Sequence, residues 1–344
     1  MNNRNFMLRA IELARNGLGL VSPNPMVGCV ITRNNVIIGE GWHGKFGGPH
    51  AEVNAINSAE ESNSLHESEL FVTLEPCSHF GKTPPCTDLI IKKRIGNVYV
   101  ANNDPNPLVA GQGIKKLVGA GIKVITGVCE LESEEMNRRY LTAIMKNRPY
   151  IILKWAQTRD GFIAKEDYDS KWISNQYSRQ IVHKWRSEED AVLAGFNTVK
   201  YDNPKLNVRN WDGRNPVRVI IDFKKELDPG LHVFDRLQRT IVFNHSVSDH
   251  FENLEYVKIS KGEFPGEMLQ YLVKTGIHSI FVEGGKATLQ AFIDQNVWDE
   301  SRLFISGTNY SRGIKAPQLS GHHLIEEKQI MTDRLYIYRN NSTT

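Results

Sequence analysis

The 344-residue chain is about twice the usual size of one domain, so two hydrophobic cores are expected before any motif is considered. Apolar residues make up 40% and charged residues 24%, a globular composition that excludes a fibrous, disordered or membrane-embedded chain. The net charge of +3, without a dense block of Lys or Arg, requires no nucleic-acid partner and suits a small anionic substrate.

The N-terminal segment predicts a helix rather than a secretory signal. Between residues 6 and 14 the apolar side chains recur at helical spacing among charged ones, whereas a signal contains an uninterrupted apolar stretch. No run approaches the ~20 apolar residues of a membrane span. Four cysteines in so long a chain indicate reduced thiols rather than a disulfide framework. We therefore expect a cytoplasmic protein without a membrane partner.

The first half of the chain alternates strand and helix patterns. Residues 27–32 and 36–39, joined by a turn at Asn34-Asn35, predict a β-hairpin. Helical patterns separate three further β-rich runs, at residues 70–74, 98–101 and 123–128. This alternation is typical of a layered α/β sheet, and we expect residues 1–147 to form one domain.

A helical segment at residues 131–145 ends before Arg148-Pro149, and the β-rich run 150–154 begins a second series of elements. We place the domain boundary there, with residues 148–344 as a second α/β domain. Its strand candidates lie at residues 191–194, 217–222, 240–243, 279–283 and 302–306.

The strongest chemical signal is a set of three zinc-ligand side chains. His50 precedes a helical pattern, and Cys77 and Cys86 each follow a proline. An imidazole and two thiolates leave one tetrahedral position on zinc open for water, which is the composition of a catalytic site. We predict that these three residues bind Zn²⁺. Cys29 and Cys129 have no companion ligand at such spacing and are expected in the core.

Glu52 would lie in the first turn of the helix that follows His50, beside the metal but free to handle protons. Zinc lowers the pKa of bound water to roughly 7, and a carboxylate can transfer the water proton to leaving ammonia. The order His-x-Glu, Cys, Cys matches the zinc deaminase signature, with eight residues between the cysteines instead of two. Taken singly, the residues could be a helix cap, a surface charge and two small core side chains; together they predict hydrolytic deamination with Glu52 as the catalytic residue.

Beyond this signature, four segments closely resemble the bifunctional riboflavin-biosynthesis deaminase/reductase family. They are residues 24–28, 50–52, 73–86 and 104–107, and the long inter-cysteine stretch is a hallmark of that family. The resemblance implies a cytidine-deaminase-like three-layer α/β/α domain followed by a dihydrofolate-reductase-like α/β domain. The first would deaminate 2,5-diamino-6-ribosylamino-4(3H)-pyrimidinone 5′-phosphate, and the second would reduce the ribosyl group to ribityl with NADPH.

The same resemblance implies further site residues in both halves. Asn24, His43 and Lys82 stand where family members line the pyrimidine and phosphate pocket. Lys154 and Glu283 match catalytic or substrate positions of the reductase, where hydride must reach the sugar C1′. The remaining substrate positions are Ser170, Arg186, Leu206 and Arg209. The cofactor positions are Ala156, Trp172, Thr198, Asp202, Gly285, Lys286, Ala287, Thr288 and Leu289.

Some of these expectations also have a physical basis. Two arginines suit a phosphate because their planar guanidinium groups bind its oxygens in pairs. Gly284-Gly285 lies between a strand pattern and a helix pattern, where backbone amides and the helix dipole can receive cofactor phosphates. Two segments depart from the family pattern, residues 304–310 and Phe223 after a strand, so cofactor contacts there are expected to differ from those of the family.

Two other functions compete with this hypothesis. One is a deaminase of tRNA or of a free nucleobase with an unrelated second domain, which would need a basic surface. The other is a zinc-stabilised nucleotide-binding protein, in which a fourth protein ligand such as His79 would complete the metal site. The resemblance further implies a homodimer or a larger homo-oligomer.

Overall fold

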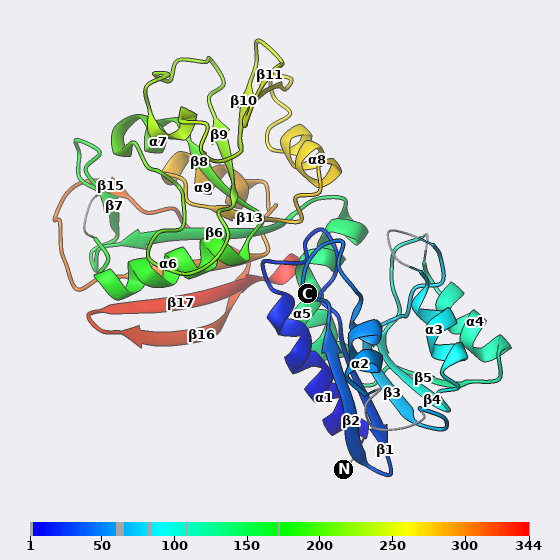
Figure 1. Ribbon diagram of the computed structural model, residues 1–344. Coiled ribbons are helices and arrows are strands. Elements are labelled where there is room, and N and C mark those ends of the chain that lie inside the picture. Colours follow the sequence, from blue (N-terminus) through cyan, green and yellow to red (C-terminus); the bar gives the residue numbers. More distant parts are fainter. Residues whose placement is uncertain (1–2, 60–64, 81–83, 108, 171–172, 344) are drawn as a thin grey trace. The chain divides into compact units, whose positions relative to one another are not determined.

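The computed structural model describes residues 3–59, 65–80, 84–107, 109–170 and 173–343 (Figure 1). The chain divides into two compact units, Met1–Asn147 and Arg148–Thr344, and each unit contains its own main sheet. Among the described residues, no helix is both long enough and apolar enough to cross a membrane.

The N-terminal unit is built on a five-stranded sheet with the order β2-β1-β3-β4-β5. Strand β1 pairs antiparallel with β2 and β3, whereas β3, β4 and β5 run parallel. The predicted hairpin and the three later strands are confirmed, although β5 ends two residues early. The strands are β1 (Gly28–Arg33), β2 (Val36–Trp42), β3 (Glu69–Leu74), β4 (Asn97–Asn102) and β5 (Lys123–Thr126).

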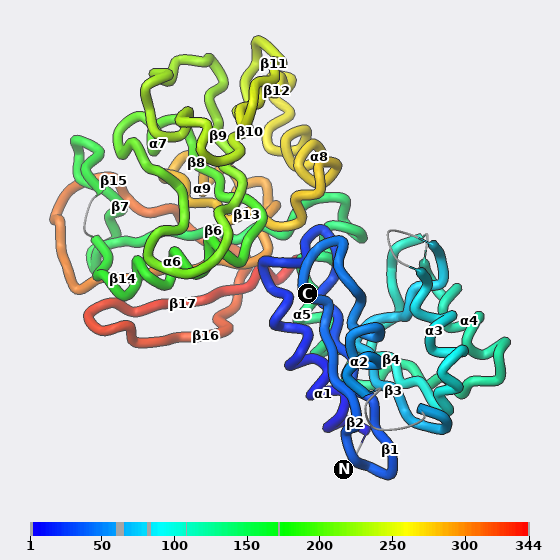
Figure 2. Tube along the Cα trace, in the orientation of Figure 1, coloured from blue at the N-terminus to red at the C-terminus, as the bar shows by residue number. Residues whose placement is uncertain are grey.

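Helices cover both faces of this sheet, because successive side chains of each strand point to opposite faces. Ile31 and Val72 pack in one core with α2, α3 and α4, while Val30 and Phe71 pack in another with α1 and α5. The expected three-layer α/β/α arrangement is confirmed, and the two helical layers can be followed in Figure 2. The helices are α1 (Asn3–Ala14), α2 (Ala51–Ala59), α3 (Cys86–Lys92), α4 (Gln112–Gly119) and α5 (Glu130–Lys146), with a 3₁₀ turn η1 (Arg15–Gly17) after α1.

Helix α2 packs directly on β2 because the strand carries glycine at the contact. A Cβ on Gly41 would lie 2.3 Å from the Ala55 nitrogen and 2.6 Å from the Ala51 oxygen, so any larger residue would push the helix away. Since α2 begins immediately after His50, this close approach places His50 and the first helical turn against the sheet.

The C-terminal unit contains a ten-stranded sheet with the order β11-β12-β10-β9-β8-β13-β6-β14-β17-β16. In this order, the strands from β12 to β14 are parallel to one another. At one edge of the sheet β11 pairs antiparallel with β12, and at the other edge β17 pairs antiparallel with β14 and with β16. The strands are β6 (Tyr150–Gln157), β8 (Ala191–Gly195), β9 (Val217–Ile221), β10 (Thr240–Asn244), β11 (Asp249–Phe251), β12 (Leu254–Lys258), β13 (Ser279–Val282), β14 (Glu300–Ile305), β16 (His322–Ile330) and β17 (Asp333–Asn340). A separate two-stranded sheet pairs β7 (Phe162–Ala164) with β15 (Ile314–Lys315).

Two hydrophobic cores separate this sheet from helices on its two faces. Side chains of α8 and α9 pack in one core, and side chains of α6 and α7 pack in the other. The helices are α6 (Gln176–Glu188), α7 (Phe196–Asp202), α8 (Gly266–Lys274) and α9 (Lys286–Asp294), with 3₁₀ turns η3 (His232–Phe234) and η4 (Asn341–Thr343). The second α/β domain expected from the sequence is therefore present.

The sequence patterns missed the strands that lack a continuous buried face. All five strand candidates of the second half are confirmed, but β7, β11, β12, β15 and the long hairpin β16–β17 were not expected. Strand β16 has no buried residue along its nine positions, so it shows none of the apolar alternation from which a strand is predicted.

Candidate active sites

The three predicted zinc ligands lie together in the N-terminal unit. Nδ1 of His50 lies 3.5 Å from Sγ of Cys77 and 3.3 Å from Sγ of Cys86. The ligand atoms of all three residues lie within 4.8 Å of one another. His50 directly precedes α2, Cys77 follows β3 and Cys86 is the first residue of α3, so two helix N-termini and one strand end supply the groups.

The chemistry of this donor set fits zinc. The pKa of Cys77 is lowered to about 4, chiefly because the Cys86 thiol donates a hydrogen bond to it, with further help from His50. The pKa of Cys86 is raised because its proton is shared with the Cys77 sulfur and its side chain is buried. Within the described ranges no fourth His, Cys, Asp or Glu joins the group, His79 included. One imidazole, two sulfurs and no fourth protein ligand characterise a catalytic rather than a structural zinc site.

Glu52 lies in the first turn of α2 and is only 3% exposed. Burial raises its pKa to about 7, and the negative charge of Cys77 acts in the same direction. A carboxyl group with this pKa can take up and release a proton near neutral pH, which is the property required of a proton shuttle.

A hydrogen-bond chain orients Asn24 beside the metal ligands. Nδ1 of His43 lies 2.9 Å from the Pro49 carbonyl oxygen, which can only accept, so Nδ1 carries the proton. Burial lowers the pKa of His43 and favours the neutral ring, whose Nε2 then accepts from the Asn24 amide at 3.1 Å. The Asn24 Oδ1 is left as an acceptor, and the His43 ring packs edge-on against His50 at 5.5 Å between centroids. Lys82, the third residue expected here, lies outside the described residues.

The C-terminal unit contains a cavity of roughly 1380 Å³ at the carboxyl ends of its parallel strands. Most of the expected reductase residues line this cavity. They are Lys154, Ala156, Ser170, Arg186, Thr198, Asp202, Leu206, Arg209, Glu283, Gly285, Lys286, Ala287 and Thr288. Leu289 instead points into the hydrophobic core and is fully buried there, and Trp172 lies outside the described residues.

Strand register brings the two expected catalytic residues of the reductase together. Val282 pairs with Leu153 between the parallel strands β13 and β6, so Glu283 and Lys154 follow on adjacent strands. The Lys154 Nζ lies 3.7 Å from Oε2 of Glu283. Burial alone would raise the pKa of Glu283, but the charges of Arg186 and Lys154 outweigh it and lower the pKa. Burial lowers the pKa of Lys154, partly offset by Glu283.

Arg186 also belongs to this charge cluster. Its Nε and Nη2 bind the two carboxylate oxygens of Glu283, the latter at 3.0 Å, and its Nη1 donates to the Asn207 carbonyl at 3.0 Å. The guanidinium fork is thus occupied by protein groups. Arg209 makes one side-chain hydrogen bond, to Oδ1 of Asn207 at 3.2 Å, and lies on the same cavity.

His183 is a cavity residue that the sequence analysis missed. It precedes Arg186 by one helical turn on α6, and its Nδ1 lies 3.1 Å from the backbone carbonyl oxygen of Asn207, which also accepts from Arg186. Because that oxygen only accepts, Nδ1 carries the proton and Nε2 is the remaining acceptor. Burial, followed by the charges of Arg186 and Arg209, lowers the pKa of His183 to about 4 and keeps the ring neutral. The sequence signal that could have identified His183 is its spacing of three residues from Arg186, which places both side chains on the same face of a helix.

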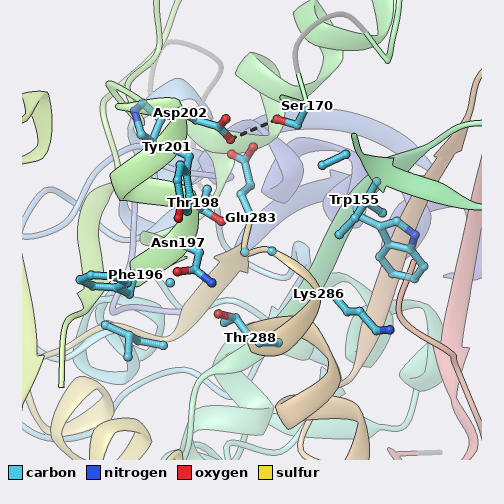
Figure 3. Close-up of a pocket in the computed structure, with 18 of the residues that line it drawn as sticks. Trp155, Ser170, Phe196, Asn197, Thr198, Tyr201, Asp202, Glu283, Lys286 and Thr288 are labelled. Atoms are coloured by element: carbon cyan, nitrogen blue, oxygen red, sulfur yellow. Dashed lines mark hydrogen bonds between the residues drawn. The ribbon is translucent and has the colours of Figure 1, made fainter. Parts of the chain in front are cut away.

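On another side of the cavity, the segment before α6 contacts helix α7. Ser170 donates a hydrogen bond to Asp202 at 3.1 Å, drawn with Glu283 and Thr198 in Figure 3. The rings of Tyr168 and Tyr201 stack at 4.3 Å with an interplanar angle of 4°. The two tyrosines line the cavity and contact each other between the same two segments. They too were not predicted from the sequence.

Glycines at the start of α7 and before α9 let the backbone approach Thr288 closely beside the cavity. A Cβ on Gly195 would lie 2.1 Å from the Thr288 Oγ1, and one on Gly284 would lie 2.7 Å from the Thr288 Cβ. Gly285 is the N-cap of α9, and no side chain caps this terminus. The backbone N–H groups at the start of α9 thus border a cavity, which is the arrangement that receives anionic groups. Lys286 and Thr288 extend from this turn in Figure 3.

The two departures from the family pattern have different positions. Phe223 lines the cavity and stacks on His245 at 4.5 Å. Residues 304–310 do not line it; the end of this segment is tied to the turn after β6, where the Tyr310 N–H donates to Asp160 at 3.0 Å. Among the described residues, the departure at residues 304–310 therefore lies outside the cavity lining.

Comparison with known proteins matches each half of the chain to a known family. Residues 1–102 match a family described as the cytidine and deoxycytidylate deaminase zinc-binding region, and residues 149–308 match the RibD C-terminal domain. The riboflavin biosynthesis protein RibD of Aquifex aeolicus is 42% identical over 331 residues, covering 94% of this chain and 92% of the relative. The chain belongs to the RibD family.

Solved structures support the same assignment over almost the whole chain. The diaminohydroxyphosphoribosylaminopyrimidine deaminase/5-amino-6-(5-phosphoribosylamino)uracil reductase of Thermotoga maritima is 40% identical, with a TM-score of 0.91 and 98% of each chain covered. RibD of Acinetobacter baumannii is 34% identical, with a TM-score of 0.90 and the same coverage.

The comparisons confirm the predicted activity class. The chain is a bifunctional enzyme of riboflavin biosynthesis with a zinc-dependent deaminase domain and an NADPH-dependent reductase domain. The predicted fold class, a cytidine-deaminase-like domain followed by a reductase domain, is confirmed as well. The tRNA or nucleobase deaminase with an unrelated second domain, and the non-catalytic zinc protein, are not supported.

The neutral state of His183 predicts a pH-dependent stability of the C-terminal unit. In the unfolded chain the His183 ring takes up a proton near pH 6.5, whereas in the folded protein it does so only near pH 4. The free energy of unfolding therefore falls as pH decreases through this window. His183→Gln is expected to flatten that slope in urea unfolding followed by tryptophan fluorescence. The control is His232→Gln, which removes an exposed histidine that also bonds a carbonyl through Nδ1. Equal slopes for wild type and His183→Gln would contradict the assignment.

Proposed function

We propose that the N-terminal domain hydrolyses the 2-amino group of 2,5-diamino-6-ribosylamino-4(3H)-pyrimidinone 5′-phosphate, and that the C-terminal domain then reduces the ribosyl chain to ribityl with NADPH. The names of both half-reactions in the Thermotoga maritima relative support this substrate pair. The observation that carries the deaminase half is the buried Glu52 carboxyl beside the His50, Cys77 and Cys86 group.

In the deaminase site, His50, Cys77 and Cys86 would hold the zinc ion. When bound, zinc supplies a Lewis acid that makes water nucleophilic at neutral pH. Glu52 acts as the proton carrier, because its pKa of about 7 lets it accept a proton from water and return it to the departing nitrogen.

Asn24 is proposed to recognise the pyrimidine. Its amide nitrogen is engaged with His43, so its Oδ1 accepts from an N–H group of the ring or its amino substituents. This assigns His43 an orienting role, supported by its position between the Pro49 carbonyl and Asn24. Lys82 is proposed as a partner of the substrate phosphate, on the resemblance alone.

In the reductase site, Lys154 and Glu283 are proposed to act at the ribosyl group. NADPH, when bound, supplies the hydride. Lys154 places a positive charge or a proton donor beside the sugar, and Glu283 holds Lys154 through the 3.7 Å ion pair. Since Arg186 is engaged with Glu283, Arg209 is the better phosphate ligand of the two arginines, and Arg186 orients the carboxylate.

The remaining cavity residues divide between substrate and cofactor. Ser170 and Leu206 are proposed on the substrate side. The turn at the start of α9 is proposed to receive the cofactor phosphates, because the backbone N–H groups at the N-terminus of this helix border the cavity. The proposed cofactor residues are Ala156, Trp172, Thr198, Asp202, Gly285, Lys286, Ala287, Thr288 and Leu289, the last through its backbone because its side chain is in the core.

Glu52→Gln tests the deaminase assignment. Glutamine keeps the shape but cannot carry the proton, so ammonia release is expected to fall by about 10²–10⁴-fold while zinc content stays at wild-type level. NADPH oxidation with supplied deaminated intermediate should be unchanged, because that cavity lies in the other domain. Ammonia release at the wild-type rate, or loss of both activities in a folded protein, would contradict the proposal.

Lys154→Met tests the reductase assignment. Removal of the ammonium group is expected to lower NADPH-dependent reduction by about 10²–10⁴-fold, with ammonia release unaffected. Glu283 retains its bidentate partner Arg186, so the cavity should stay folded. The control is Lys184→Met on α6, which removes a lysine paired with Glu188 outside the cavity lining. Equal loss in both variants would refute a specific role for Lys154.

We also infer a homodimer or a larger homo-oligomer located in the cytoplasm. Strand β16 is a sheet edge that exposes Leu324 and Ile325, which supports pairing with a second copy of the chain. The free thiols of all four cysteines fit a reducing compartment. Sedimentation equilibrium should give twice the 39.1 kDa of one chain or a larger multiple, and a monomeric mass would rule out self-association.

A further inference from the structure

The carboxylate of Glu75 is buried between β3 and the metal group, yet it contacts none of the reacting groups described above. It is 5% exposed and accepts hydrogen bonds from four backbone N–H groups. Its Oε2 accepts from Gly111 at 2.9 Å and Asp104 at 3.4 Å, and its Oε1 accepts from Gly113 at 2.9 Å and Ile114 at 3.3 Å.

Two of these donors belong to the first turn of α4. The N-cap of α4 is Gly111, which has no side chain and adopts a left-handed conformation with φ 73°. The free N–H groups of Gly113 and Ile114 are therefore satisfied by a residue far away in sequence, at the positions that a local Ser or Asp cap would serve. The negative charge of Glu75 also complements the positive end of the helix dipole.

The same helix touches the residue between Glu75 and Cys77. A Cβ on Gly113 would lie 2.0 Å from the Pro76 oxygen, so α4 rests directly on this turn. On its other side, the Cys77 carbonyl accepts from the Thr87 N–H at 3.2 Å, and the Cys77 sulfur accepts from the Cys86 N–H at 3.4 Å. The turn that carries Cys77 is thus held between the N-termini of α3 and α4.

We propose that Glu75 is a positioning residue of the deaminase, which caps α4 from outside the helix and thereby fixes Cys77 for metal binding. This inference rests on the proposed role of Cys77 as a zinc ligand. Groups that orient metal ligands without touching the metal commonly change its affinity by about 10–100-fold when they are replaced. Glu75 meets this description because only Pro76 separates it from the ligand.

The direct test is Glu75→Gln. Glutamine has nearly the same size but turns one acceptor oxygen into an NH₂ group facing backbone N–H donors, so one half of the cap is lost. Zinc affinity, measured by competition with a chromogenic chelator, is expected to fall by about 10–100-fold. The sulfur-to-cobalt charge-transfer band of Co²⁺-substituted protein should shift, while NADPH-dependent reduction stays at the wild-type rate.

A second variant perturbs the contact from the other side. Gly113→Ala keeps Glu75 but places a methyl group against the Pro76 oxygen, and the same changes in zinc affinity and cobalt spectrum are expected. Gly119→Ala is its matched control, because a Cβ there meets nothing within 4 Å. Glu69→Gln is the control for Glu75→Gln: Glu69 begins the same strand, and its oxygens accept from the side chains of Tyr99 and Asn97 instead.

Each outcome decides the question. Wild-type zinc affinity and cobalt spectrum in Glu75→Gln and Gly113→Ala would overturn the positioning role. Equal losses in the two controls would also overturn it, because they would indicate general destabilisation. A wild-type protein that binds no zinc would overturn the proposed metal centre itself, a result separate from any difference among variants.

Discussion

The deaminase site depends on holding two sulfurs, an imidazole and a carboxyl group close together, with Cys86 and Glu52 buried and with His50 and Cys77 half-buried. Such groups are stable there only when backbone N–H groups or opposite charges face them. Three helices supply this environment. His50 and Glu52 lie at the start of α2, Cys86 begins α3, and Glu75 caps α4 next to the turn of Cys77. The sheet brings these helix N-termini together, and their dipoles favour negative charge at that place.

The reductase site uses a related arrangement on a different sheet. Glu283 and Lys154 follow each other across adjacent parallel strands, and Arg186 from α6 completes the charge cluster. The N-terminus of α9 borders the same cavity at the carboxyl ends of the strands, where open α/β sheets bind their ligands. Buried charges here are compensated by partners within the cluster, so the cavity can remain preformed.

Sequence reasoning was most reliable where chemistry is encoded in residue type and spacing. The His-x-Glu and cysteine pattern identified the metal group, and buried strands identified the two α/β domains. It could not show the contacts of a residue whose partners are distant in sequence. Arg186 was expected to bind phosphate, yet its donors are engaged with Glu283 and the Asn207 carbonyl. Leu289 was expected among the cofactor contacts, but its side chain faces the core, because the helical turn rotates it away from the cavity.

By itself, the sequence determined which groups could hold a metal, which family the chain resembles and where its two domains divide. Only the tertiary structure decided that His50, Cys77 and Cys86 meet within 4.8 Å, that Asn24 presents its oxygen, and that Glu75 caps a helix. The reason is physical. Ligand identity is a property of single side chains. Proximity, tautomer and amide orientation depend instead on hydrogen bonds between segments, and the number of residues between two segments does not tell how far apart they lie in the fold.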